Sequence, residues 1–255
     1  MVDRVNWREH LAHVSKRHVL VSNLLGPADS SSDTFALTVM DNMQVIARHL
    51  AQPGQTGDYH VHFNQEQVYF FLGGTAKMHV DERVYSVRPG SVISLPATCY
   101  HQLINDGDEW AAHLLIAGAP IPPEQQQRNQ EAIAANGPGG SKLPIAARHW
   151  SDLSPQDGDL GGEFVWQLLR PPEVATIGGV DYCRLYPGNG QRAHRHADHE
   201  QVIYVVEGRG AVKVEGETAD VRDGDMVYVP AGAEHAVENL ADDWLAYLAI
   251  DALPV

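Results

Sequence analysis

The chain has 255 residues, enough for two domains of modest size, and its 44% hydrophobic content is sufficient for two cores. A formal net charge of −15 argues against nucleic acid or an anionic membrane as a partner. Two cysteines, Cys99 and Cys183, indicate no disulfide framework. The N-terminal stretch shows neither a signal-peptide pattern nor a membrane span, so we expect a cytoplasmic protein.

The predicted elements of the first half are mainly short strands. Residues 3–18 are interpreted as a short helix and residues 19–32 as a loop. Two strands are expected between Thr34 and Leu50, because Val, Ile, Leu, Phe and Met are frequent there. Further strands are expected within 59–80 and 84–95, and a last apolar strand within 110–116.

A linker follows at residues 121–144. It begins in a proline-rich stretch, continues as a predicted helix from Glu124 to Ala135, and ends in a Gly/Pro-rich run. We therefore predict an N-terminal domain at 1–120 and a C-terminal domain at 145–255. Many short strands between Gly/Pro turns predict an all-β fold of two double-sheet barrels.

A repeat relates the two predicted domains. Four potential metal ligands recur at a constant offset of 134 residues (194 − 60, 196 − 62, 200 − 66 and 235 − 101). The first set is His60, His62, Glu66 and His101, and the second set is His194, His196, Glu200 and His235. Three imidazoles and a carboxylate suit a divalent transition metal, so one metal site in each domain is expected.

Strand parity places the members of each set. His194 and His196 are two residues apart, so both side chains project from one face of a strand, and Glu200 keeps the same parity. The third histidine, His235, must come from another strand. Counting by twos also predicts a largely apolar pocket surface, whose walls are Val68, Phe70, Leu103, Val202, Tyr204 and Val237.

These motifs resemble the cupin superfamily, whose two patterns are G-x5-H-x-H-x3,4-E-x6-G and G-x5-P-x-G-x2-H-x3-N. The first copy matches the first pattern up to Gly73, and Thr98 replaces a glycine of the second pattern. The second copy closes its first pattern at Gly208, one residue late. The resemblance implies two tandem cupin barrels of the double-stranded β-helix (jelly-roll) type, each with a site for a metal ion.

Other residues are candidates for catalysis beside the metal. Glu66 or Glu200 could also accept a proton, Tyr204 is the one polar residue of the predicted walls, and His113 aligns with Tyr247 in the last strand of each copy. His199 neighbours Glu200, so its parity predicts a surface position.

The leading hypothesis is a metal-dependent oxygenase that uses Fe(II) or Mn(II) and acts on a small apolar or aromatic substrate. The first alternative is a non-oxidative isomerase, decarboxylase or lyase, in which the metal is a Lewis acid. The second is a metal-containing small-molecule binding protein. Zinc and nickel are alternative metals, and a homodimer is left open.

Overall fold

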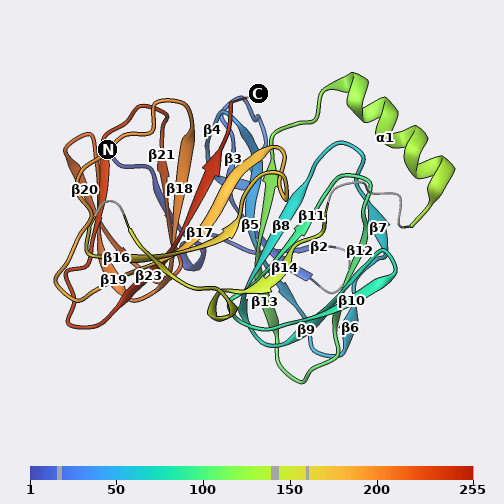
Figure 1. Ribbon diagram of the computed structural model, residues 1–255, viewed down its shortest axis with the longest axis horizontal. Helices are drawn as coiled ribbons and strands as arrows, with labels where there is room; N and C mark the ends of the chain where they lie inside the picture. Colours follow the sequence, from blue (N-terminus) through green and yellow to red (C-terminus); the bar gives the residue numbers. More distant parts are fainter. Residues whose placement is uncertain (16–18, 139–143, 159–160, 255) are drawn as a thin grey trace.

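The computed structural model describes residues 1–15, 19–138, 144–158 and 161–254. Figure 1 shows two β-rich halves side by side, with one helix at the outer edge of the N-terminal half. The predicted all-β architecture of two barrels with a short helix between them is confirmed. Within the described ranges, no helix is long and apolar enough to cross a membrane.

The N-terminal half consists of one large and one small sheet. Its strands are β2 (His13–Ser15), β3 (Val19–Pro27), β4 (Phe35–Met40), β5 (Met43–Ala51), β6 (Gln55–Thr56), β7 (His60–Val61), β8 (Gln67–Gly73), β9 (Ala76–Val80), β10 (Arg83–Val87), β11 (Ser91–Leu95), β12 (Tyr100–Asn105) and β13 (Ala111–Gly118). The large sheet has the order β14-β11-β8-β13-β5-β3-β2, in which β14 is Ala147–His149, and β4 also pairs with β3. The small sheet has the order β10-β9-β12-β6, and β7 pairs with β12.

The C-terminal half repeats this plan. Its strands are β15 (Gln156–Asp157), β16 (Glu163–Leu169), β17 (Ile177–Leu185), β18 (Glu200–Glu207), β19 (Arg209–Val214), β20 (Glu217–Arg222), β21 (Asp225–Val229), β22 (His235–Glu238) and β23 (Leu245–Ala252). The large sheet has the order β1-β21-β18-β23-β17-β16-β15, in which β1 is Arg4–Asn6, and the small sheet has the order β20-β19-β22.

Helix α1 (Pro123–Asn136) confirms the helix predicted in the linker. Proline at its first turn and Gly137 at φ +59° after its end suit the two helix termini. The Asn129 amide donates a hydrogen bond of 2.8 Å to the Phe63 carbonyl, so α1 docks on the N-terminal half. Residues 139–143 of the linker lie outside the described residues.

The helix predicted for residues 3–18 is wrong. This segment contains β1, a 3₁₀ turn η1 (Trp7–Glu9) and β2, while residues 16–18 lie outside the described ranges. The reason is tertiary, because Arg4–Asn6 pairs with β21 of the opposite half. Pairing with a distant strand has overridden a weak local helical pattern.

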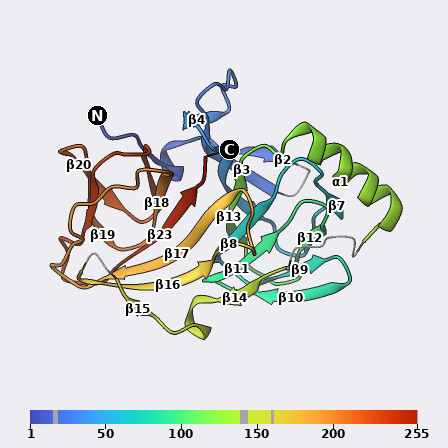
Figure 2. The ribbon, with the colours of Figure 1, turned by 45° about the horizontal axis from the view of Figure 1, so that its top comes forward.

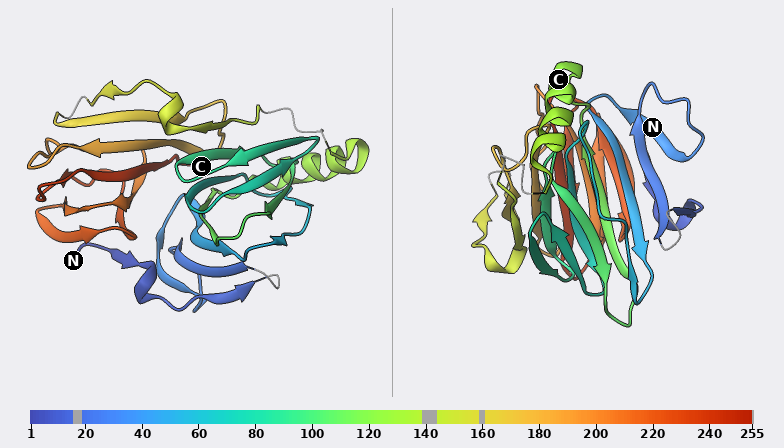
Figure 3. Two further views of the ribbon diagram at one scale, coloured as in Figure 1. Left: turned by 90° about the horizontal axis from the view of Figure 1, so that it is seen from below. Right: turned by 90° about the vertical axis from the view of Figure 1, so that its right-hand side faces the viewer.

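Each half lends its first strand to the sheet of the other half. β1 pairs with β21, and β14 pairs with β11. Figure 2 shows the N-terminus beside the C-terminal half, and the left view of Figure 3 shows the yellow segment that includes β14 running along both halves. Each large sheet therefore contains a strand from the other predicted domain. The domain ranges of 1–120 and 145–255 remain a prediction.

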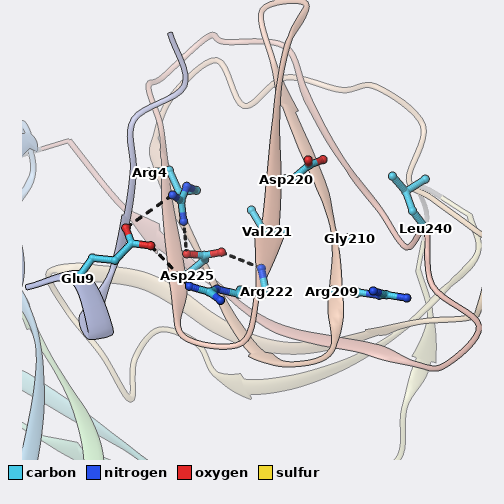
Figure 4. A pocket seen from close by; sticks show the side chains of 9 residues that line it. All are labelled: Arg4, Glu9, Arg209, Gly210, Asp220, Val221, Arg222, Asp225 and Leu240. Atoms are coloured by element: carbon cyan, nitrogen blue, oxygen red, sulfur yellow. Dashed lines mark hydrogen bonds and ion pairs between the residues drawn. The ribbon is translucent and has the colours of Figure 1, made fainter.

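Ion pairs anchor the exchanged strand β1 (Figure 4). Arg4 lies 2.5 Å from the Asp225 carboxylate, and Glu9 lies between Arg4 and Arg222 at 3.7 and 3.6 Å. The buried Asn6 amide also donates to Asp225 at 2.8 Å. The four charged residues line a surface pocket of about 510 Å³. The ion pairs between these residues hold the N-terminal segment on the C-terminal sheet.

A tryptophan follows each exchanged strand and lies against a glycine of the other half. Trp7 in η1 meets Gly224, and Trp150 in a second 3₁₀ turn, η2 (Trp150–Asp152), meets Gly90. A Cβ at Gly90 would lie 2.5 Å from the Trp150 ring, and one at Gly224 would lie 2.4 Å from the Trp7 ring. These two glycines are thus required for close approach as well as for their positive φ angles.

The two halves share one apolar core. The outward faces of both large sheets contribute to a single buried cluster, which includes Val68, Phe70 and Ile116 from one half and Tyr182, Val202 and Leu248 from the other. Each barrel has a separate interior cluster, one containing Tyr69 and Phe71 and the other containing Ile203 and Val205. Alternate residues of β8 and β18 therefore face the shared core and the barrel interior.

Gly224→Ala is expected to lower the free energy of unfolding by about 2–4 kcal/mol, because both the positive φ and the displaced Trp7 ring oppose it. Gly216→Ala is the matched control, since Gly216 has φ +80° but open space around its Cβ position. It should cost only about 1 kcal/mol. Urea denaturation measures both, and equal losses would contradict a packing role for Gly224.

Candidate metal centres

The N-terminal barrel brings three histidines together. His60 on β7 pairs directly with His101 on β12, and His62 follows β7. Their ring centroids lie 4.4 to 5.3 Å apart, and their potential ligand atoms all lie within 4.8 Å of one another. The predicted histidine set of the first copy is therefore assembled in space.

The C-terminal barrel repeats the arrangement with His194, His196 and His235. The backbones of His194 and His235 exchange hydrogen bonds of 3.0 and 2.9 Å, and the three ring centroids lie 4.1 to 5.1 Å apart. Burial lowers the pKa of all three imidazoles, that of His235 to about 4. The neutral form, which metal binding requires, is thus favoured near neutral pH.

Four of the six imidazoles are held by the same local contact. The Nδ1 atoms of His60, His101, His194 and His235 lie 2.9 to 3.1 Å from the backbone carbonyl two residues earlier. A carbonyl can only accept, so Nδ1 must carry the proton and Nε2 is left as the ligand atom. The Nε2 of His235 is buried and has no hydrogen-bond partner among the residues that the structure describes. A divalent metal fits these donors, and each half carries one such site.

The predicted carboxylate ligands are wrong for this arrangement. Glu66 accepts hydrogen bonds of 2.6 to 3.0 Å from the backbone of Ala175, Thr176 and Ile177 in the C-terminal half. Glu200 accepts 2.8 and 3.0 Å bonds from the backbone of Asn42 and Asp41 in the N-terminal half. Both carboxylates are buried and join the two halves instead of meeting the histidines.

The error lies in carrying parity across a break in the strand. His62 and His196 precede β8 and β18, and three residues that are not continuous strand separate each histidine from its glutamate. Within the strands, Glu66 shares its side with Val68 and Phe70, which face the shared core. Val202 and Tyr204 lie on the corresponding side of β18. The predicted walls on β8 and β18 are thus on the face turned away from the barrel interior, whereas the predicted walls Leu103 and Val237 belong to the interior clusters.

Glutamines occupy the barrel-facing positions that the sequence reasoning missed. Gln67 and Gln201 have the parity of the interior residues Tyr69 and Ile203. The Nε2 atom of Gln201 lies 3.4 Å from the Nε2 atom of His196, and it donates to Asp251 at 2.8 Å. Gln67 accepts from the Tyr69 hydroxyl at 3.2 Å. A neutral amide therefore lies beside the C-terminal triad, and Gln67 has the equivalent barrel-facing position in the N-terminal half.

A glycine signal in the sequence would have identified these glutamines. Gly74 and Gly208 both have positive φ, and an added Cβ would lie 2.4 and 2.5 Å from the carbonyl oxygens of Trp110 and Trp244. They are equivalent in the two copies, whereas Gly73 has no such requirement. Counting back from these glycines by the family spacing leads to Gln67 and Gln201. The glycine that ends the first pattern of the second copy one residue late, Gly208, already indicated this register in the sequence.

The two remaining catalytic candidates have different positions. Tyr204 lies in the shared core, where burial raises its pKa to about 12, so its predicted place in the pocket is wrong. His113 is buried in the N-terminal barrel, stacked on Tyr69 at 4.5 Å and 5.1 Å from the His49 ring. Within the described part of the chain, the two ring nitrogens of His113 have no hydrogen-bond partner. A catalytic role for His113 remains a prediction.

A cavity of about 480 Å³ adjoins the C-terminal triad. His194 and His196 line it together with polar residues of β16, β17 and β23. His199, predicted to lie on the surface, also lines it and stacks on His196 at 4.4 Å, because the chain between His196 and β18 is not extended strand. The cavity is therefore more polar than the sequence suggested.

A buried carboxyl group lies in this cavity. Glu163 accepts hydrogen bonds from the Tyr247 hydroxyl at 2.7 Å and from the Gln191 amide at 3.0 Å. Burial raises the pKa of Glu163, and the two hydrogen bonds oppose that shift only in part. The pKa values of Tyr247 and Cys183 are also raised by burial. A carboxyl with a raised pKa beside a metal site is suited to proton transfer.

Comparison with known proteins supplies the family. The family described as "Cupin domain" matches residues 48–118 and 181–251, together more than half of the chain. A tetracenomycin polyketide synthase protein, TcmJ, of Streptomyces glaucescens is 33% identical over 73 residues, which cover 28% of this chain and 49% of the relative. The chain spans about half to two thirds of the first curated relatives that it matches.

Two oxalate decarboxylases resemble the chain over most of its length. The Bacillus subtilis enzyme OxdC is 23% identical over 84% of this chain and 68% of the relative. One structure of the B. subtilis enzyme, described for its Mn(II) centres, has a TM-score of 0.70 at 16% identity, covering 97% of this chain and 76% of that chain. The Lactobacillus farciminis enzyme, solved as a formate complex, has a TM-score of 0.72 at 17% identity, covering 99% and 86%.

Glu66→Ala is expected to retain both metal ions while lowering the free energy of unfolding by about 2–4 kcal/mol, because three backbone amides lose their acceptor. His60→Ala with His62→Ala should instead remove one ion of two. Elemental analysis and denaturant unfolding distinguish the outcomes. Loss of an ion from folded Glu66→Ala protein would restore Glu66 as a ligand.

His113 makes stability depend on pH. Its folded pKa lies well below 6.5 because of burial, so between the two values the unfolded chain binds more protons. The contribution of His113 to the free energy of unfolding is fully present above about pH 6.5. Below that pH it falls by about 1.4 kcal/mol per pH unit. His113→Phe should remove this slope. Parallel unfolding curves for both proteins between pH 7.5 and 5 would contradict the burial of a neutral imidazole.

Proposed function

We propose that this chain, which belongs to the cupin family, is a metal-dependent enzyme whose C-terminal barrel carries out non-oxidative chemistry. The reaction class is isomerisation, decarboxylation or elimination on a small organic molecule. The observation that supports this proposal is a single cavity lined by both the His194–His196 pair and the buried carboxyl group of Glu163. The likeness to oxalate decarboxylases supports the non-oxidative class over the oxygenase hypothesis.

His194, His196 and His235 would hold the metal through their Nε2 atoms, and we propose the Gln201 amide as a fourth donor. Mn(II) is our choice, because a solved relative is described with Mn(II) centres. When bound, the ion supplies Lewis-acid polarisation of a substrate oxygen. A neutral glutamine leaves more of the positive charge uncompensated than a glutamate would, which favours polarisation of a carbonyl or carboxylate.

Glu163 is the proposed proton carrier. Its Oε2 accepts from Tyr247 and Gln191, so the carboxyl group is held in one orientation in a residue that lines the cavity. Because burial raises its pKa, the group can bind a proton at a higher pH than an exposed glutamate. It would add a proton to, or remove one from, the substrate carbon or oxygen next to the polarised group.

Two sequence features motivated the oxygenase hypothesis. It used a glutamate in each ligand set and a largely apolar wall, whereas Glu200 and Tyr204 lie on the side of β18 that faces the shared core. The C-terminal cavity is instead lined by carboxylate, amide and imidazole groups. Oxygen chemistry remains the alternative outcome of the experiment below.

The test is turnover in the absence of oxygen. Mn(II)-loaded protein is incubated anaerobically in D2O with hydroxy acids, keto acids and sugars, and NMR detects deuterium incorporation, isomerisation or loss of a carboxyl group. Glu163→Gln should lower kcat about 10²- to 10⁴-fold with unchanged metal content. The control Glu207→Gln, an exposed carboxyl on the same half, should be unaffected.

Two results would count against the proposal. Turnover that requires and consumes O2 would favour the oxygenase. Full activity of folded, metal-loaded Glu163→Gln protein would remove Glu163 as the proton carrier.

A further inference from the structure

The acidic groups of the C-terminal cavity are not required by the fold. Asp181 on β17 and Asp251 on β23 line it, and the equivalent positions 134 residues earlier are Ala47 and Ala117. The N-terminal barrel builds the same strands with alanine at both places. Burying a carboxylate costs free energy, and burial raises the pKa of Asp181. Two barrel-facing carboxylates in one half therefore indicate a function specific to that cavity.

The cations that line the cavity are already paired. Arg170 binds both carboxylate oxygens of Asp181, at 2.6 and 2.5 Å. Arg195 lies 3.2 Å from the carboxylates of both Glu215 and Glu234. An unpaired guanidinium or ammonium group beside the metal would give a small dianion strong charge-assisted hydrogen bonds. Neither of these two arginines offers such a group, and the Asp251 carboxylate would repel a negatively charged group of the ligand.

Two further arginines on the preceding strands are directed elsewhere. Arg184 on β17 stacks over Trp244 at 4.8 Å, and Arg48 on β5 stacks over Trp7 at 3.8 Å. Neither lines the cavity. The cavity therefore differs from a site built to hold a dicarboxylate, although the fold resembles that of oxalate decarboxylases.

The polar groups that remain suit hydroxyl groups. A hydroxyl donates one hydrogen bond and accepts others, so it pairs with a carboxylate and an amide at once. Gln201 and Asp251 form one such adjacent pair at 2.8 Å, and Gln191 and Glu163 form a second at 3.0 Å. Gln167, an exposed amide, also lines the cavity. A volume of about 480 Å³ accommodates a molecule of small-sugar size.

We propose that the C-terminal cavity binds a neutral, hydroxyl-rich molecule of the carbohydrate class and selects against dianions such as oxalate. The proposal rests on the proposed function, because the same cavity is taken as the substrate site. The hydroxyl groups are bound by two pairs of side chains, Asp251 with Gln201 and Glu163 with Gln191. Asp181 keeps Arg170 from binding an anion.

Titration calorimetry of the Mn(II)-loaded full-length protein tests this selectivity. The probes are D-xylose as a neutral sugar, oxalate as a dianion and ethanolamine as a cation. D-xylose should bind the unaltered protein at least about tenfold more tightly than oxalate or ethanolamine. Metal content is measured before and after each titration, so that removal of the ion by oxalate is recognised.

Two variants locate the binding in the C-terminal cavity. Asp251→Ala copies the N-terminal barrel and should weaken D-xylose at least about tenfold. Asp181→Asn frees Arg170 and should strengthen oxalate by at least about tenfold. The matched control is Asp223→Asn, which removes an equal charge and frees Arg8 from a 2.5 Å ion pair outside the cavity. It should change neither affinity.

The proposal is overturned if oxalate or ethanolamine binds more tightly than D-xylose, or if D-xylose gives no heat with the metal in place. Unchanged D-xylose binding by folded Asp251→Ala protein overturns it as well. These failures are distinct from failure of the proposed function, which depends on oxygen-independent turnover and on Glu163→Gln. A sugar that binds but reacts only with O2 would support the inference and reject the proposed reaction class.

Discussion

The shared apolar core between the two large sheets is the constraint on which the rest of the structure depends. Alternate side chains of β8 and β18 must cover each other across the interface, and this fixes which face of each strand is turned away from its own barrel. Glu66 and Glu200 begin these faces, so their carboxylates reach the backbone amides of the opposite half. The residues next in sequence, Gln67 and Gln201, are consequently turned toward the barrel interiors.

Reciprocal exchange strengthens the same interface. β1 and β14 extend the sheets of the opposite halves, and Trp7 and Trp150 follow them into positions that only glycine permits on the other side. The Asn6 and His149 side chains cap the two 3₁₀ turns in the same way, by accepting from the backbone amide two residues later. Asn6-Trp7 and His149-Trp150 are 143 residues apart, so this second correspondence does not share the offset of the metal motifs.

One barrel frame supports two different interiors. Around the N-terminal triad are Tyr69, His113 and His49, and the equivalent positions in the C-terminal half are Ile203, Tyr247 and Cys183. Strand pairing and turn glycines are retained, because they serve the backbone. The side chains directed inward are free to differ, since the shared core is formed by the opposite face of each strand. The C-terminal interior thus combines acid–base groups with the metal donors.

The sequence by itself determined the all-β class, the duplication, the linker helix and the six histidines, because regular spacing and turn residues are local signals. The tertiary structure alone decided the strand exchange and the roles of the glutamates. Three residues of irregular backbone separate His62 from Glu66, so side-chain parity could not be carried from the histidines into the strand. A shift of one residue exchanges Glu66 for Gln67 on the barrel-facing side of the strand, and only packing against the other half settles which of them faces inward.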